Sequence, residues 1–414
     1  MKSVDCPDNW QQLEFGALVK DMGDGGTPPR NKPEYFSGDI NWCTVTDIKR
    51  FINDTEEKIS VLGLRNSSAK LWPENSVILS TGATIGEVGI VKIKTATKQG
   101  LTGIVLKEDK ADATYIYYLL SSITNLLKRY SQGSTFREIR PPILSRIPVL
   151  VPPLLEQRKI AEILSMVDET IEKTDAIVKE TQQLKKGLMQ KLFSEGIGHT
   201  RFKETEIGQI PEEWELPKLL ELSVDGINNG VFNDPQKVGR GYKLINVKDM
   251  YSGSRIDTDN LSLLDLESAE FARSKVMYGD IFFTRSSLVV KGIGFCNINL
   301  SRDDNMTYDG HLMRIRLDSE RVFPQYLVTF CKTAAARRYL ISIGKTTTMT
   351  TLSQRDLGGL PVACPPMNEQ HRIAGIISEV DTKIEVEQAL KSGLEQFKKG
   401  LMQVLLTGKV RVKV

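Results

Sequence analysis

The residues that could catalyse a reaction do not complete any known motif. Gly344-Lys345-Thr346 resembles the end of a phosphate-binding P-loop. That motif needs a glycine five residues before Gly344, and position 339 is a tyrosine. The glycines near Gly82 do not follow the dinucleotide-binding spacing either, and no N-P-P-[YF] methyltransferase motif is present. We therefore predict a chain that is not an enzyme, with no catalytic residue and no metal site.

The three histidines also lack a nucleophile and base arranged around them. His371 replaces an arginine of a repeated segment on a helix surface, where we expect it to be solvated or interfacial. His311 lies on a strand-like run, where a packed imidazole is expected, and His199 lies in a polar connector. None of the three indicates acid–base chemistry.

Composition narrows the class of protein without assigning a function. The chain has 414 residues, and 55 basic and 52 acidic residues give it a net charge of +3. A nucleic-acid binder usually has a larger basic excess, although one positive face is enough. Five scattered cysteines form no CxxC pair, which argues against a disulfide framework or a zinc site. Together with the absence of a signal-peptide pattern, this predicts a cytoplasmic protein.

An internal repeat is the strongest feature of the sequence. Residues 147–193 align without gaps to residues 360–406, with 23 identities over 47 positions, and both copies contain KKGLMQ. Each copy begins with Pro-Pro, and apolar residues then recur at steps of three and four, as in a coiled coil. The first copy has Ile160, Leu164, Val167 and Ile171 at these positions, and the second has Ile373, Ile377, Val380 and Ile384. We expect two long helices that pack on each other. The alternative is that each helix packs on a separate core.

The segments before the two helices have similar lengths and share shorter similarities. Val45-Thr46-Asp47-Ile48 corresponds to Val247-Lys248-Asp249-Met250, and residues 76–80 correspond to residues 280–284. Short β-type runs with one or two helical stretches predict mixed α/β domains. Two diverged domains on two related helices form a pseudo-twofold protein, and DNA half-sites are the commonest ligand with that symmetry.

These residues carry a resemblance to a known family. Gly26-Thr27-Pro28, the loop of residues 80–86, and the twice-occurring PP-x-x-EQ-x-x-I resemble segments of the specificity (S) subunit of type I restriction–modification systems. The resemblance covers essentially the whole chain. The second domain departs from it, since that domain has no G-T-P turn and its loop reads Thr284-Arg285-Ser286-Ser287.

The resemblance implies an α+β fold in which two target recognition domains are separated by an antiparallel coiled coil. The expected boundaries are residues 1–153 and 201–366 for the domains, and 154–200 and 367–414 for the helices. Each domain would read one half of a bipartite double-stranded DNA target, and the helices would set the gap and bind two modification (M) subunits. Restriction (R) subunits would complete the complex. S-adenosylmethionine would belong to the M subunits, and ATP and Mg to the R subunits, so that this chain binds no cofactor.

Basic and small polar side chains in the loops are the predicted DNA contacts, because lysine and arginine bind phosphates and polar side chains read base edges. In the first domain these are Arg30, Lys32, Thr81, Thr84, Lys98, Gln99, Ser134, Thr135, Arg137 and Arg140. In the second domain they are Lys237, Arg240, Lys243, Arg285, Ser286, Lys291, Lys345, Thr346 and Arg355.

The residues common to the two helices are the predicted partner contacts. They are Glu156, Gln157, Lys186, Gly187 and Met189, with Glu369, Gln370, Lys399, Gly400 and Met402. Glycine in a helix costs about 1 kcal/mol relative to alanine. We therefore expect Gly187 and Gly400 to admit close approach of a partner or of the opposing helix, rather than only to mark a helix end.

Two other functions remain open from the sequence alone. The chain could be a coiled-coil adaptor that holds two protein-binding domains and does not touch DNA. It could also serve a single-chain restriction–methylase instead of separate subunits. The DNA target and the gap length do not follow from the sequence.

Overall fold

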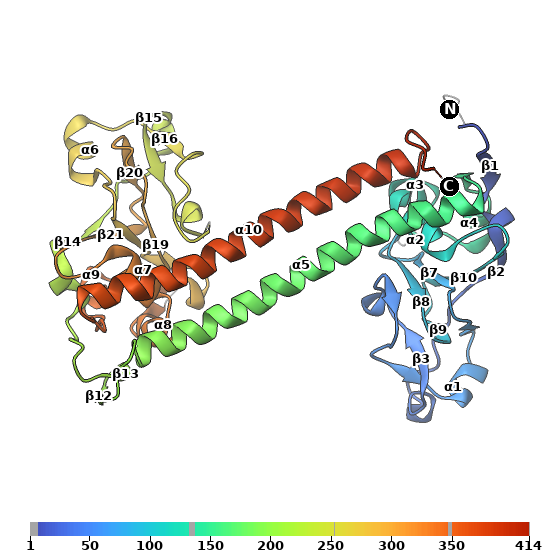
Figure 1. Cartoon of the computed structure of the whole chain (residues 1–414), viewed down its shortest axis with the longest axis horizontal. Helices are drawn as coiled ribbons and strands as arrows, with labels where there is room; N and C mark the ends of the chain where they lie inside the picture. Colours follow the sequence, from blue (N-terminus) through green and yellow to red (C-terminus); the bar gives the residue numbers. More distant parts are fainter. Residues whose placement is uncertain (1–6, 132–136, 252, 347–349, 414) are drawn as a thin grey trace. The chain divides into compact units, whose positions relative to one another are not determined.

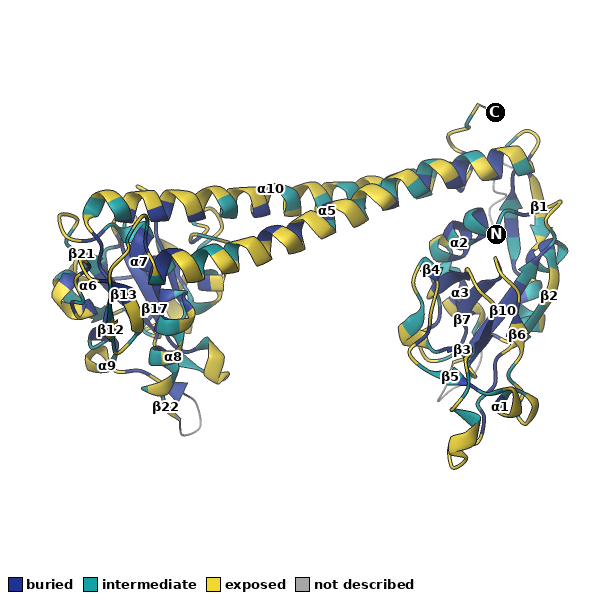
Figure 2. Ribbon diagram, turned by 60° about the horizontal axis from the view of Figure 1, so that its bottom comes forward, coloured by how far each residue is buried: buried dark blue, intermediate teal, exposed yellow. Residues whose placement is uncertain are grey.

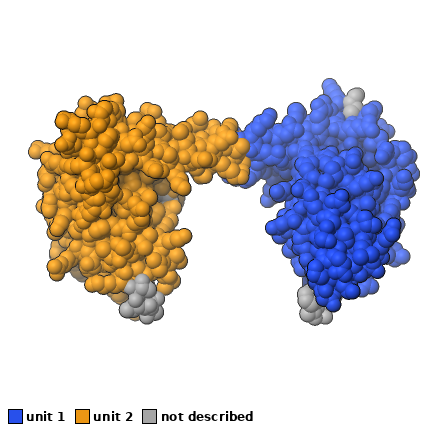
Figure 3. Space-filling model, turned by 90° about the horizontal axis from the view of Figure 1, so that it is seen from below, with its two compact units in different colours: residues 1–173, 390–414 blue, residues 174–389 orange. Residues whose placement is uncertain are grey.

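Two compact units make up the chain in the computed structural model, which describes residues 7–131, 137–251, 253–346 and 350–413. Unit 1 consists of residues 1–173 and 390–414, and unit 2 consists of residues 174–389 (Figure 3). Two long helices, α5 (Leu154–Ser194) and α10 (Met367–Leu405), contribute to both units (Figure 1). Each begins directly after its Pro-Pro pair, because proline and the residue before it disfavour helical backbone.

Unit 1 is built on a five-stranded sheet in the order β2-β10-β7-β8-β4. Its strands are β2 (Val19–Asp24), β10 (Leu101–Leu106), β7 (Val77–Ser80), β8 (Val88–Val91) and β4 (Phe51–Ile52). A four-stranded sheet contains β5 (Lys58–Ile59), β3 (Ile40–Cys43), β9 (Thr95–Thr97) and β6 (Leu71–Trp72), and a two-stranded sheet contains β1 (Gln11–Glu14) and β11 (Pro148–Val151). The short helices are α1 (Val61–Arg65), α2 (Ala113–Ser122), α3 (Thr124–Tyr130) and α4 (Pro141–Ser145).

Unit 2 has a related topology with a four-stranded main sheet. Its main sheet has the order β14-β21-β17-β19, with β14 (Ser223–Asn229), β21 (Leu312–Leu317), β17 (Ile281–Thr284) and β19 (Cys296–Ile298). A second sheet contains β16 (Ser262–Leu264), β15 (Val238–Ile245) and β20 (Met306–Tyr308), and a third contains β18 (Ser286–Ser287), β23 (Thr350–Thr351) and β22 (Lys345–Thr346). The remaining elements are the hairpin β12 (Phe202–Thr205) and β13 (Gly208–Pro211), and the helices α6 (Ser268–Ser274), α7 (Pro324–Cys331), α8 (Ala334–Ser342) and α9 (Gln354–Gly358).

The repeated strands occupy equivalent places in the two units. The β7 sequence VILS and the β17 sequence IFFT are buried throughout and lie at the same position in their sheets. Such continuous apolar runs are typical of strands covered on both faces. The corresponding parallel pairs are β3 with β9 and β15 with β20. The correspondence between residues 76–80 and residues 280–284 is therefore confirmed, as is the predicted α+β fold class.

The ends of the two helices pack inside the units, which corrects part of the predicted seam. Ile160 and Leu164 belong to the core of unit 1, and Ile373 and Ile377 belong to the core of unit 2. The apolar stripe of each helix thus has two roles. Its residues near the helix start pack in the core of the adjoining domain, and its later residues lie in the seam between the helices. Farther along, the seam includes polar side chains, among them the buried Thr174.

Two ion pairs in the helical seam have a repeated arrangement. In unit 1 the Asp168 carboxylate lies 2.6 Å from Lys398 Nζ, and in unit 2 the Lys185 ammonium group pairs with Asp381. Asp168 and Asp381 are equivalent positions of the sequence repeat, and so are Lys185 and Lys398. Asp168 comes before Lys185 on α5, but its partner Lys398 comes after Asp381, the partner of Lys185, on α10. The two helices are therefore antiparallel. Charged seam positions of this kind select register at some cost in stability.

Candidate nucleic-acid interface

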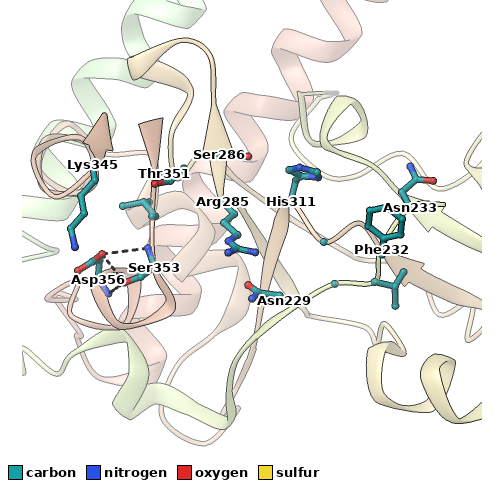
Figure 4. Close-up of a pocket in the computed structure, with 14 residues that line it drawn as sticks. Asn229, Phe232, Asn233, Arg285, Ser286, His311, Lys345, Thr351, Ser353 and Asp356 are labelled. Atoms are coloured by element: carbon teal, nitrogen blue, oxygen red, sulfur yellow. Dashed lines mark hydrogen bonds between the residues drawn. The ribbon is translucent and has the colours of Figure 1, made fainter. Parts of the chain in front are cut away.

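An open cleft of about 820 Å³ lies in unit 2 at the ends of the main-sheet strands. Asn229 ends β14, Arg285 follows β17, and His311 precedes β21, so three neighbouring strands deliver these side chains to the cleft. Figure 4 shows this group with Lys345 on one side and Phe232 on the other. Binding residues commonly lie on loops that a buried sheet positions in this way.

Arg285 is positioned by its backbone and keeps its guanidinium group exposed. Its N–H donates to the His311 carbonyl at 2.8 Å, and its carbonyl accepts from Leu352 N–H at 2.9 Å. Among the described residues the Arg285 side chain has no hydrogen bond or ion pair, and the same holds for the Asn229 side-chain amide. These two groups are available to a ligand at the floor of the cleft.

Close backbone packing shapes this floor. A Cβ atom on Gly230 would lie 2.1 Å from the Tyr308 carbonyl oxygen, so the turn after β14 accepts only glycine there. The neighbouring Val231 N–H donates to the same carbonyl at 2.9 Å, and Gly310 N–H donates to the Val231 carbonyl at 2.7 Å. The loop that carries Asn229 is thereby fixed against the loop that carries His311.

One acidic group also lines the cleft. Ser353 Oγ donates to Asp356 Oδ2 at 2.6 Å, and this hydrogen bond lowers the pKa of the Asp356 carboxyl. Asp356 therefore stays ionised at neutral pH while it caps helix α9. A carboxylate among cations disfavours phosphate locally, but it can accept a hydrogen bond from an exocyclic amino group of a base.

The cleft brings together only some of the second-domain residues predicted to bind DNA. Arg285, Ser286 and Lys345 line it, whereas Arg355 is exposed on α9 and Lys291 is exposed in a separate turn. Thr346 is in β22, but its side chain lies outside the described residues.

The predicted cations on and before β15 lie in a different sheet. Arg240 pairs with Asp265 at 2.9 Å and Lys243 with Asp303 at 2.7 Å, so their charges are compensated inside the unit, while Lys237 is exposed.

In unit 1 the prediction for Thr81 is wrong. Its side chain is fully buried, and Thr81 Oγ1 lies 3.0 Å from Thr102 Oγ1 beneath the loop. The equivalent position in unit 2 is Arg285, which is exposed. At this point of the fold, unit 2 therefore exposes an arginine, whereas unit 1 exposes no side chain from the equivalent position.

Arg30 is also engaged within unit 1. Its guanidinium group binds both carboxylate oxygens of Glu57 and lies over the rings of Phe36 and Trp42. Lys98 Nζ lies 5.8 Å from the centre of the same Trp42 ring. Lys32, Thr84, Gln99, Arg137 and Arg140 are exposed, and Ser134 and Thr135 lie outside the described residues.

Four of the predicted partner contacts point into the units instead, which corrects that prediction. Glu156, Gln157 and Gln370 are buried, and the Glu369 side chain is 11% exposed. The Gln157 side chain forms hydrogen bonds with the backbone of Asp112, Lys110 and Pro152. The Gln370 side chain forms the equivalent hydrogen bonds with the backbone of Phe323, Arg321 and Pro365. These side chains attach each helix start to its domain.

The KKGLMQ segments remain accessible on both helices. Figure 2 shows exposed residues along both α5 and α10. Lys186, Gly187, Lys399 and Gly400 are exposed, and Met189 and Met402 are half-buried. A Cβ atom on either glycine would meet no atom of the described residues within 4 Å, so the described part of the opposing helix does not use this gap. Large apolar side chains one heptad apart lie exposed nearby, namely Ile177 and Leu184 on α5 and Leu390 and Phe397 on α10.

Several exposed residues had no predicted role. Asn229 and Phe232 belong to the segment Asn-Asn-Gly-Val-Phe-Asn-Asp. Its turn-forming composition was the feature of the sequence that could have indicated an exposed loop here. His311 was expected to be packed, but its side chain is 68% exposed, with Nδ1 2.9 Å from Asp309 Oδ1. Leu184 and Phe397 occupy equivalent positions of the repeat. This equivalence was the feature of the sequence that could have indicated the exposed apolar stripes.

Two further properties limit the kinds of site that the described residues offer. Within them, no group of three or more His, Cys, Asp or Glu side chains could hold a metal ion. No helix among them is long and apolar enough to cross a membrane.

Comparison with known proteins gives consistent matches over the whole chain. The model of the type I restriction modification DNA specificity domain matches residues 7–183 and again residues 211–396. The type I restriction enzyme MjaVIII specificity subunit of Methanocaldococcus jannaschii is 26% identical over 420 residues, covering 100% of this chain and 96% of the relative. The EcoKI specificity subunit of Escherichia coli is 25% identical over 345 residues, 79% of this chain and 72% of the relative. The fold is similar to the crystal structure of an S subunit from M. genitalium, with a TM-score of 0.60 and 15% identity over 98% of this chain and 97% of that one.

Proposed function

Because the chain belongs to the type I restriction–modification DNA specificity family, with the family's domain present twice, we propose that each unit reads one half of a bipartite DNA target. The chain is then a recognition subunit, and catalysis belongs to its partners. The observation that carries this proposal is the pair of equivalent positions Thr81 and Arg285. One topology, used twice, places in unit 2 an exposed guanidinium group that has no partner among the described residues, whereas the equivalent side chain of unit 1 is buried and offers nothing to DNA. Two different half-sites would require such a difference.

The unit 2 cleft supports direct reading of base edges. Arginine forms a bidentate pair with guanine O6 and N7, and asparagine forms one with adenine N6 and N7. Arg285 and Asn229 present these groups in one cleft, free of other partners among the described residues. Lys345 at the rim supplies a cation for phosphate. We assign guanine contact to Arg285 and adenine contact to Asn229.

DNA and the modification and restriction subunits are the partners of this chain in the proposed complex. We propose that two M subunits bind the exposed stripes, one at Ile177 and Leu184 and the other at Leu390 and Phe397. Apolar residues spaced by seven on a helix suit packing against a partner helix, and the same stripe occurs once in each repeat. S-adenosylmethionine would be held by the M subunits and ATP with Mg by the R subunits, in the cytoplasm.

A methylation map tests the proposed function. The chain would be co-expressed with the methyltransferase subunit encoded beside it in a host without DNA methylation, and modified adenine would be located by sequencing native DNA. We expect one split motif with two unlike halves and a fixed gap. An intact complex that leaves no modified adenine would contradict DNA recognition and favour the protein-binding adaptor.

Substitution at the KKGLMQ glycines tests the partner surface. We expect Gly187→Leu and Gly400→Leu each to weaken binding of the M subunit about tenfold or more, because a bulky side chain in a packed interface costs 1–3 kcal/mol. A Cβ atom at either position meets nothing within 4 Å among the described residues, and both positions are exposed, so the fold tolerates a side chain there. Affinity would be measured by titration of the purified subunits.

Gly375 provides the matched control, because it is also an exposed helical glycine with no atom within 4 Å of an added Cβ. Gly375→Leu should leave M-subunit binding unchanged. Equal binding by all three variants would remove the KKGLMQ segments from the interface.

A further inference from the structure

Phe232 is one of the two most exposed large hydrophobic side chains among the described residues. It is 78% exposed, and only Leu288, at 84%, exceeds it. Phe232 lies at the rim of the unit 2 cleft that also contains Arg285 and Asn229 (Figure 4). An exposed aromatic ring in the lining of this cleft, beside Arg285 and Asn229, is available to a ligand that enters it.

The local fold does not depend on the Phe232 ring. Its neighbour Val231 is 6% exposed and contributes to a buried cluster, and Gly230 forms the tight approach to Tyr308. Phe232 itself contributes its backbone carbonyl, which accepts from Asp234 N–H at 3.1 Å. No ring contact of Phe232 occurs among the residues that the structure describes. Its side chain can therefore be removed without leaving a cavity.

The chemistry of a DNA major groove has one apolar feature to offer such a ring. Each base pair presents hydrogen-bond donors and acceptors there, and thymine adds its C5-methyl group. Arg285 and Asn229 match the hydrogen-bonding edges of guanine and adenine, so an apolar side chain in the same cleft matches the methyl group of a neighbouring thymine.

We propose that Phe232 is a specificity-determining residue that contacts the C5-methyl group of a thymine in the half-site read by unit 2. The inference rests on the proposed function, since it needs DNA in this cleft. Its ligand is double-stranded DNA with an A·T pair next to the base pair read by Arg285. The other apolar contact with DNA, insertion of the ring between base steps, would not depend on the methyl group.

Deoxyuridine, which lacks only this methyl group, tests the proposal directly. The complex of the chain with its M subunits would be titrated with duplexes of the mapped target, in which each thymine of the unit 2 half-site is replaced in turn by deoxyuridine. We expect one replacement to weaken binding by the unaltered complex about fourfold, the value of one buried methyl group. Phe232→Ala should lose at least as much on the thymine duplex and lose nothing further on that deoxyuridine duplex.

The control is Leu288→Ala, which removes an equally exposed apolar side chain of unit 2 that does not line the cleft. It should retain the thymine preference. Equal loss by Phe232→Ala on both duplexes would overturn the methyl contact in favour of insertion, and unchanged binding by Phe232→Ala would remove the residue from recognition. Failure of the proposed function is separate, because the unaltered complex would then not prefer the bipartite target over unrelated DNA.

Discussion

Arg285→Ala is expected to reduce modification of the target about tenfold to a hundredfold and to relax the sequence requirement in one half only. The guanidinium group has no partner among the described residues, and loss of one bidentate contact with guanine costs about 1–3 kcal/mol of discrimination. The methylation map of the variant complex measures both effects. At one position of one half-site, other bases should be accepted, while the opposite half and the gap stay unchanged.

Arg240→Ala is the matched control for the loss of a positive charge from unit 2. Arg240 is an exposed arginine that already pairs with Asp265 and lies outside the cleft. Its removal should leave the recognised sequence unchanged. Equal relaxation of both half-sites by Arg285→Ala would indicate a folding defect in the variant, and an unaltered motif would remove Arg285 from base reading.

The architecture could be predicted from the sequence because its signals are local and occur twice. Pro-Pro directly precedes α5 and α10, and proline keeps the residue before it out of the helical conformation, so that each helix begins after the pair. The correspondence between β7 and β17 was visible because buried strands require continuous apolar runs, whatever the surrounding loops contain.

The direction of individual side chains could not be predicted in the same way. Glu156 and Gln157 are polar, recur at Glu369 and Gln370, and lie on helices that also have exposed faces, so an outward orientation was the simpler expectation. They point inward because the first turn of each helix is covered by its own domain, which sequence periodicity does not reveal. Thr81 is buried for the same reason, since the loop above it closes through tertiary contacts.

The inward glutamates make a similar set of contacts at the start of each helix, within its own unit. In unit 1 Glu156 accepts from Trp10 Nε1 at 3.2 Å and from Arg411 Nε at 2.7 Å. In unit 2 Glu369 accepts from Trp214 Nε1 at 3.1 Å and lies 3.0 Å from His199 Nε2.

Both units use a glutamate and a tryptophan indole in these contacts. The basic side chain, in contrast, comes from a different segment in each unit. The connector supplies it in unit 2, and the C-terminal residues supply it in unit 1. Arg411 also donates to the Asp8 carbonyl at 2.7 Å. In unit 1 the segments around Asp8 and Arg411 thus contact each other near the glutamate, where unit 2 has one connecting segment.

Gln370→Met is expected to lower the stability of unit 2 by about 3 kcal/mol. Gln370 is buried, its Oε1 accepts from Phe323 N–H at 2.8 Å, and its Nε2 donates to the carbonyls of Arg321 and Pro365 at 3.1 and 2.9 Å. Methionine has nearly the same shape but satisfies none of these groups, and each buried unsatisfied group costs about 1–3 kcal/mol. Because α10 begins at Met367, the first turn of the helix should also separate more often from its domain.

Hydrogen exchange of the whole chain distinguishes this result from a general loss of stability. Peptides that contain the Phe323 amide should exchange faster in Gln370→Met, while those that contain the Asp112 amide of unit 1 keep their protection. Gln157→Met is the matched variant and should reverse the pattern, because Gln157 Oε1 accepts from Asp112 N–H at 3.0 Å. Similar acceleration at both amides in both variants would mean that the two units do not open separately, whereas unchanged exchange would show that these hydrogen bonds do not hold the helix to its domain.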